Sequence, residues 1–125
     1  MLGMSGTVLI VDDDAAVRSA LKFLLELEGL DVRVYDGPIA LLAESNLPAR
    51  GCLVVDYRMP RMDGLQLIEQ LRARHVDLPV ILITDRASVD LRRRAARSGA
   101  RQVLEKPLSD SALVEGIRSI LAMPA

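Results

Sequence analysis

The strongest constraint on the fold is a fivefold alternation of short apolar runs with segments of helical periodicity. The apolar runs are mostly rich in β-branched residues and cover residues 7–11, 32–35, 52–55, 79–84 and 102–104. The helical segments cover residues 15–28, 38–45, 65–74 and 88–99, and a last one starts at Ser109. This order predicts βαβ units and therefore an α/β fold, a doubly wound parallel sheet of five strands with five flanking helices.

Length and composition are those of one ordinary domain. The chain has 125 residues, 50% of them hydrophobic, a net charge of −1 and a single cysteine. A chain of this size folds without a metal or a disulfide. No stretch approaches the ~20 apolar residues of a membrane span, and the N-terminus lacks the basic segment of a signal peptide. We therefore expect one cytoplasmic domain over residues 1–125, with no membrane contact.

The small net charge hides a local concentration of arginines. Residues 86–101 contain six arginines and one acidic residue, whereas the remainder is acidic. Five of these arginines lie on the fourth predicted helix and its exit: Arg92, Arg93, Arg94, Arg97 and Arg101. The near-zero net charge and the lack of interleaved aromatic residues argue against direct nucleic-acid contact. The cluster is either a solvated helix face or a surface for an acidic partner, including a second copy of the chain.

Polar residues stand where the predicted strands end. Because ligands of such sheets bind at the carboxyl ends of the strands, these residues mark the candidate site. They are Asp12, Asp13 and Asp14 after the first strand, Asp56 after the third, Thr84 at the end of the fourth and Lys106 after the fifth. Grouped carboxylates suit a hard divalent cation, and a carboxylate can attack phosphorus. A hydroxyl and an ammonium group can then hold phosphoryl oxygens.

The same residues resemble the receiver domains of two-component response regulators. The matching segments are VLIVDDD at 8–14, VVDYRMPRMDGL at 54–65, PVILIT at 79–84 and EKP at 105–107. The resemblance covers essentially the whole chain. It implies a flavodoxin-like fold with strand order 2-1-3-4-5, and a receiver domain that fills residues 1–125 and leaves no output domain in this chain. The segments 11–18 and 57–65 are most similar to nitrogen-fixation regulators, which usually carry a DNA-binding output domain.

The resemblance also implies a role for each strand-end residue. Those roles are Asp56 as phosphoacceptor, Thr84 and Lys106 as contacts to phosphoryl oxygens, and Asp12, Asp13, Asp56 and the backbone carbonyl of Arg58 as ligands of Mg2+ or Mn2+. The peptide bond between Lys106 and Pro107 is typically cis in this family. The domain would catalyse only its own phosphorylation and dephosphorylation, and would not be an enzyme otherwise.

The implied partners follow from the same likeness. The phosphoryl group would come from a histidine kinase, a phosphotransfer protein or a small phosphodonor. Phosphorylation would change the face made by the fourth helix, fifth strand and fifth helix. Receivers use this face to form homodimers or to control an output domain.

Several positions depart from the family pattern or modulate it. Val103 stands where the family usually has a Tyr or Phe that turns inward on activation, so it either alters the coupling or simply packs as a strand residue. Asp85 follows Thr84, where a small residue is usual; its carboxylate should repel an anionic phosphodonor unless it pairs with Arg58 or Arg86. Arg58 and Arg86 stand at rim positions, where they either shield an aspartyl phosphate from water or are solvated charges.

Two other functional classes remain open at this point. A haloacid-dehalogenase-type phosphatase would use Asp12 as nucleophile and Asp14 as acid and base, but the chain lacks room for its usual cap and the motif at Asp56 stays unexplained. A receiver-like binding module that signals without phosphorylation would accommodate Asp85 and Val103.

Overall fold

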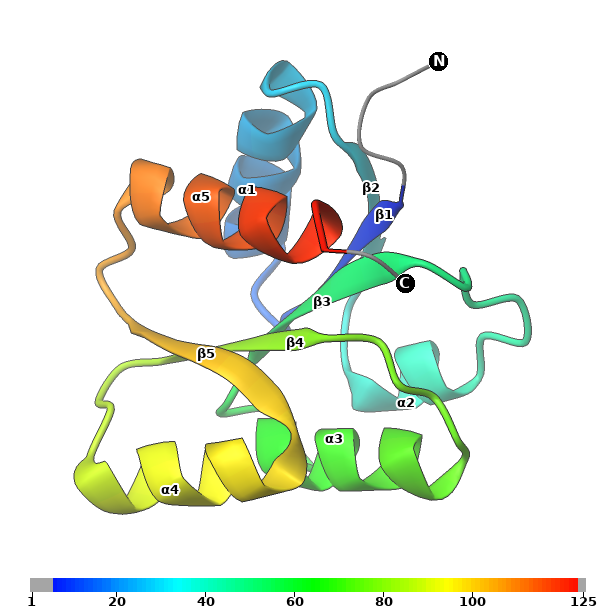
Figure 1. The fold of residues 1–125 in the computed structure, drawn as a ribbon, viewed down its shortest axis with the longest axis vertical. Helices are drawn as coiled ribbons and strands as arrows, with labels where there is room; N and C mark the ends of the chain where they lie inside the picture. The colour runs from blue at the N-terminus through cyan, green and yellow to red at the C-terminus, as the bar shows by residue number, and fades with distance from the viewer. Residues whose placement is uncertain (1–5, 124–125) are drawn as a thin grey trace.

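The computed structural model describes residues 6–123, which form a five-stranded parallel sheet with helices on both faces (Figure 1). The strands are β1 (Thr7–Val11), β2 (Asp31–Tyr35), β3 (Gly51–Asp56), β4 (Val80–Thr84) and β5 (Ala100–Glu105). The helices are α1 (Ala15–Leu27), α2 (Pro38–Leu42), α3 (Gly64–Ala73), α4 (Val89–Ser98) and α5 (Asp110–Leu121). The strand order β2-β1-β3-β4-β5 confirms the predicted fold. The ends of the predicted domain, residues 1–5 and 124–125, lie outside the described residues.

The position of each strand in the sheet explains its sequence. β1, β3 and β4 lie in the middle and are buried throughout, because helices cover both of their faces. β2 and β5 lie at the edges and mix buried, half-buried and exposed residues. The apolar run at 102–104 therefore underestimates the length of β5. Pairing with β4 extends from Ala100 to Glu105, although the residues at these ends carry little apolar character.

Two apolar layers hold the helices against the sheet. On one face α1 and α5 contribute to one apolar layer, with Leu25 and Ile117 fully buried (Figure 1). On the other face α2, α3 and α4 bury Leu41, Leu71 and Ala95. None of the helices within residues 6–123 is long and apolar enough to cross a bilayer.

Helix boundaries follow local capping chemistry. The side chain of Asp14 accepts hydrogen bonds from the first turn of α1, as a helix cap should, and Ser88 and Ser109 do the same for α4 and α5. Gly99 ends α4 in the left-handed conformation, at φ 102°. α2 is shorter than the predicted 38–45 and ends at Leu42, because the polar residues 44–46 favour a turn over a further helical turn.

Gly64, the first residue of α3, lies against the backbone of β3. A Cβ atom there would meet the Asp56 carbonyl oxygen at 2.9 Å and Cδ1 of Leu82 at 2.7 Å. We expect Gly64→Ala to lower the free energy of unfolding by about 1–3 kcal/mol, since the strand backbone has to move.

Chemical denaturation checks this expectation. The matched control is Gly37→Ala, because a Cβ at Gly37 would have no atom within 4 Å. The Gly64 variant should unfold at a clearly lower denaturant concentration than the Gly37 variant, and equal midpoints would contradict the close approach.

Candidate functional site

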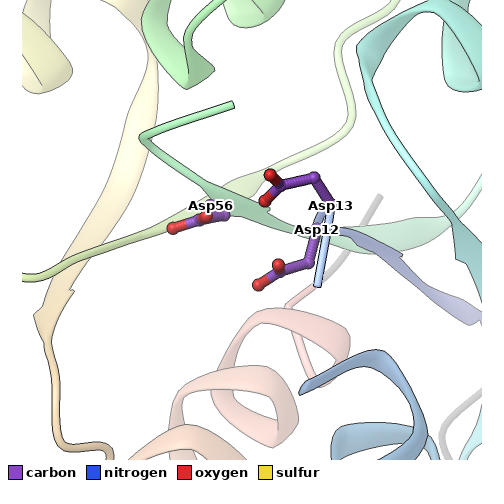
Figure 2. Close-up of side chains that lie close together, drawn as sticks. All are labelled: Asp12, Asp13 and Asp56. Carbon is purple, nitrogen blue, oxygen red and sulfur yellow. The ribbon is translucent and has the colours of Figure 1, made fainter. Parts of the chain in front are cut away.

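The pairing of β1 with β3 places two aspartates side by side. The register joins Val11 to Val55, so the next residues, Asp12 and Asp56, leave the sheet next to each other. Asp13 follows Asp12, and carboxylate oxygens of the three residues all lie within 4.8 Å of one another. Figure 2 shows the three side chains gathered at the ends of these strands. The acidic cluster, Asp12, Asp13 and Asp56, is thus assembled by sheet topology.

Burial governs the charge state of the acidic cluster. Asp12 and Asp56 are buried, whereas Asp13 is exposed. The pKa of Asp56 is raised to about 6, first by loss of solvent and then by the negative charge of Asp12, against the opposing charge of Lys106. Loss of solvent also raises the pKa of Asp12, although the Asp14 N–H donates a 2.9 Å hydrogen bond to its carboxylate.

The chemistry of this donor set fits a hard divalent cation. Neighbouring carboxylates with little access to water repel one another, and a cation with oxygen ligands relieves that repulsion. Asp12 and Asp56 supply buried oxygens, and the exposed Asp13 leaves room for water ligands. Arg58 lies exposed in the loop after β3, and its backbone carbonyl stays a predicted ligand.

Lys106 brings a positive charge to the acidic cluster. Its Nζ lies 3.5 Å from Oδ1 of Asp56, and its side chain is about one-third exposed. The backbone N–H of Lys106 donates a 2.8 Å hydrogen bond to the Thr84 carbonyl, which joins the loop after β5 to the end of β4. The peptide bond between Lys106 and Pro107 is cis, as expected.

Thr84 is buried at the end of β4, next to the strand that carries Asp56. Its hydroxyl is engaged by its own loop: Oγ1 accepts a hydrogen bond from the Arg86 N–H at 3.3 Å and donates to the Arg86 carbonyl at 3.2 Å. In this arrangement the hydroxyl is held by the loop after β4 instead of bonding to Asp56.

The predicted modulatory residues lie around this centre. Asp85, Arg86 and Arg58 are all exposed. None of the ion pairs within residues 6–123 joins Asp85 to Arg58 or Arg86. Val103 is half-buried and packs against the core on the α3 and α4 face. Its packing agrees with the simpler expectation of a strand residue.

The arginine cluster is less uniform than its sequence suggests. Arg92, Arg93, Arg94 and Arg97 are exposed on α4. Arg101, which the sequence places at the exit of this helix, belongs to β5, and its guanidinium contacts Sδ of Met123 beyond α5. Only the arginines of α4 therefore share one helix.

Sequence reasoning missed Arg18, whose Nη1 donates a 2.8 Å hydrogen bond to the backbone carbonyl of Asp12. A signal was available, because Arg18 is the fourth residue of α1, and helical side chains point back toward the N-terminus. Arg18 holds the backbone just where β1 delivers Asp12 to the acidic cluster.

Comparison with known families agrees with this geometry. The profile described as "Response regulator receiver domain" matches residues 8–118. The chain belongs to the response regulator receiver family. Receiver domains are signalling modules of two-component regulators, and the phosphatase alternative is not favoured: the carboxylate of Asp14, its required acid and base, caps α1.

Named relatives are bacterial regulators longer than this chain. The chain is 41% identical over 119 residues to the transcriptional regulatory protein FixJ of Azorhizobium caulinodans, covering 94% of this chain and 56% of the relative. It is 42% identical over 114 residues to the C4-dicarboxylate transport transcriptional regulatory protein DctD of Pseudomonas aeruginosa, covering 91% and 25%. The chain thus spans about half of the one relative and a quarter of the other.

Solved structures show the same fold. The crystal structure of FixJ-N superposes with a TM-score of 0.87 at 34% identity, covering 98% of this chain and 99% of that one. Full-length FixJ from B. japonicum gives a TM-score of 0.84 at 36% identity, covering 95% of this chain and 59% of that one.

The raised pKa of Asp56 predicts a pH dependence of stability. A carboxyl group whose pKa rises from 3.8 to about 6 on folding stabilises the folded state below about pH 4, and this contribution is lost as the pH rises through about 6. Asp56→Asn removes the ionisation. With a chelator present, its Tm should exceed that of the wild type by on the order of 5 °C at about pH 7.5, and by less at about pH 4.5.

Thermal unfolding at both pH values makes the comparison. Asp85→Asn is the matched control, because it removes the same charge from an exposed side chain, and its Tm should stay close to that of the wild type. A less stable Asp56→Asn variant at the higher pH would contradict the assigned cost of burying this carboxylate.

Proposed function

We propose that Asp56 is the phosphoacceptor of this receiver domain and that the acidic cluster holds the Mg2+ or Mn2+ that phosphoryl transfer requires. One observation carries the proposal. The buried Asp56 carboxylate has two further carboxylates within 4.8 Å and the Lys106 ammonium 3.5 Å from Oδ1. A nucleophile, a set of cation ligands and a positive charge thus converge on one point.

The chain's own residues divide the reaction among them. A carboxylate oxygen of Asp56 forms the new bond to phosphorus, and the bond to the donor's leaving group breaks with its electron pair. The Lys106 ammonium pairs with a phosphoryl oxygen, and the Thr84 hydroxyl donates to another after it leaves the Arg86 backbone. A bound divalent cation would offset the negative charge of the carboxylates and the incoming phosphoryl group.

The phosphoryl group is proposed to come from a histidine kinase, a phosphotransfer protein or a small phosphodonor. The relatives named as transcriptional regulators favour a DNA-binding output domain in a longer parent protein, with this receiver making no nucleic-acid contact of its own. We place the domain in the cytoplasm, where such kinases deliver their phosphoryl groups. The exposed arginines of α4 support the proposal that the α4–β5–α5 face contacts a second copy or an output domain.

Two arginines would act on the lifetime of the aspartyl phosphate. Arg58 and Arg86 are each two residues beyond a central site residue, Asp56 and Thr84 respectively, and both are exposed. Long guanidinium side chains at such positions can cover a phosphoryl group and exclude water from it.

Intact-mass measurement tests the phosphoacceptor. After incubation with Mg2+ and acetyl phosphate, the wild type should gain one phosphoryl group and Asp56→Asn none. Asp12→Asn should react more slowly because it removes a cation ligand, and a chelator should stop the reaction. The control is Asp77→Asn. Asp77 is exposed and precedes β4, so it lies at the amino-terminal ends of the strands, opposite the site.

Other outcomes of this experiment would indicate one of the competing functions. An adduct that survives Asp56→Asn would overturn the assignment. Sustained phosphate release that depends on Asp12 and survives Asp56→Asn would indicate the phosphatase, and no adduct with no Mg2+ binding would indicate a receiver-like binding module.

Asp85 should slow the reaction with an anionic donor. It is exposed beside Thr84 and has no ion-pair partner within residues 6–123. We expect Asp85→Ala to raise the initial rate with acetyl phosphate by about two- to fivefold at low salt, because a repelling charge is removed, and by less at high salt. Asp77→Ala removes an equal charge far from the site and should leave the rate unchanged. An equal or slower rate for Asp85→Ala at matched Mg2+ would refute the repulsion.

A further inference from the structure

The loop between β4 and α4, residues 85–88, is tied to the edge strand β5. The carboxylate Oε2 of Glu105 accepts a 2.8 Å hydrogen bond from the backbone N–H of Ala87. Glu105 is the last residue of β5 and pairs with Thr84 across the two strands. The sheet register thus places the Glu105 carboxylate beside the loop that follows Thr84.

A second tie joins α4 to the same strand. Nη1 of Arg92, in the first turn of α4, donates a 3.3 Å hydrogen bond to the backbone carbonyl of Val103. Both donors belong to the segment that follows Thr84, and both acceptors belong to β5. We call this pair of contacts, Ala87 to Glu105 and Arg92 to Val103, the β5 latch.

The β5 latch acts on the segment that holds the Thr84 hydroxyl. That hydroxyl is bound by the backbone of Arg86, the residue next to Ala87. For the hydroxyl to donate to a phosphoryl oxygen on Asp56, its hydrogen bond to the Arg86 carbonyl must break, which releases one of the contacts that fix the loop. A contact made in only one of two arrangements shifts their equilibrium by its own free energy.

We propose that Glu105 and Arg92 are positioning residues that hold this loop in the arrangement in which Thr84 faces Arg86, and so oppose the phosphorylated arrangement. The inference rests on the proposed role of Asp56. These contacts would oppose phosphorylation without an aromatic ring at position 103, since β5 contributes only its backbone carbonyl there.

The expected size of the effect is modest. The side chains of Glu105 and Arg92 are exposed, and one such hydrogen bond changes an equilibrium by about two- to tenfold. If both contacts bias the same two arrangements, the fold-changes of the single variants should multiply in the double variant.

Binding of beryllofluoride, a phosphoryl mimic, in the presence of Mg2+ measures the equilibrium on the full chain. Glu105→Ala and Arg92→Ala should each bind it about two- to tenfold more tightly than the wild type, and the double variant by about the product. Glu105→Gln keeps an oxygen acceptor and should lie between the wild type and Glu105→Ala. The control is Glu69→Ala: Glu69 is exposed on α3, outside the α4–β5–α5 face, and its side chain makes no hydrogen bond or ion pair within residues 6–123, so the affinity of this variant should be unchanged.

Hydrogen exchange of the Ala87 amide, measured without beryllofluoride, tests the contact itself. It should be faster in Glu105→Ala than in the wild type and unchanged in Glu69→Ala. Tighter binding is a result that mere structural damage does not produce. Unchanged or weaker binding by Glu105→Ala and Arg92→Ala, with a wild type that binds, would overturn the β5 latch alone. A wild type that does not bind beryllofluoride would overturn the role of Asp56 and the β5 latch that rests on it.

Discussion

Parallel pairing of β1 with β3 forces two buried carboxylates, Asp12 and Asp56, to lie side by side, and the chemistry of the domain depends on that unfavourable contact. Loss of solvent raises the pKa of both carboxylates, and the negative charge of Asp12 raises that of Asp56 further, to about 6. The two carboxylates cannot offset this cost of ionisation between themselves. It creates a strong preference for positive charge, which Lys106 meets in part and a divalent cation would meet more fully.

The remaining parts of the site are placed by the same sheet. Thr84 and Lys106 come from the ends of β4 and β5, the next strands along, and the hydrogen bond from the Lys106 N–H to the Thr84 carbonyl joins these ends. The Thr84 hydroxyl is occupied by its own loop, and that loop is tied to β5 through Glu105. We infer that phosphorylation of Asp56 would alter the α4 and β5 surface through a change in the hydrogen bonds of this short segment. Such an exchange of a few weak contacts is what makes a reversible signal attainable at modest energetic cost.

Much of this was predictable from the sequence, for physical reasons that also mark where prediction stops. Alternating strand and helix periods predict the parallel sheet, and strand-end residues in such sheets must meet at one edge, so Asp12, Asp56 and Lys106 could be placed together. The end of the edge strand β5 was harder to predict, because Glu105 belongs to the strand through backbone pairing, and the pattern of apolar residues does not reveal such pairing. The contact of Arg18 with the Asp12 carbonyl depends on a side-chain rotamer, and the separation of Arg101 from the arginines of α4 depends on where the helix ends.

Chemical trapping identifies the phosphorylated residue. Borohydride reduces an aspartyl phosphate to homoserine, so the protein would be phosphorylated with acetyl phosphate and Mg2+, reduced and mapped by peptide mass spectrometry. We expect homoserine at position 56 and at no other aspartate. Homoserine at position 12 or 13, or phosphate found only on the exposed His75 beyond α3, would contradict it.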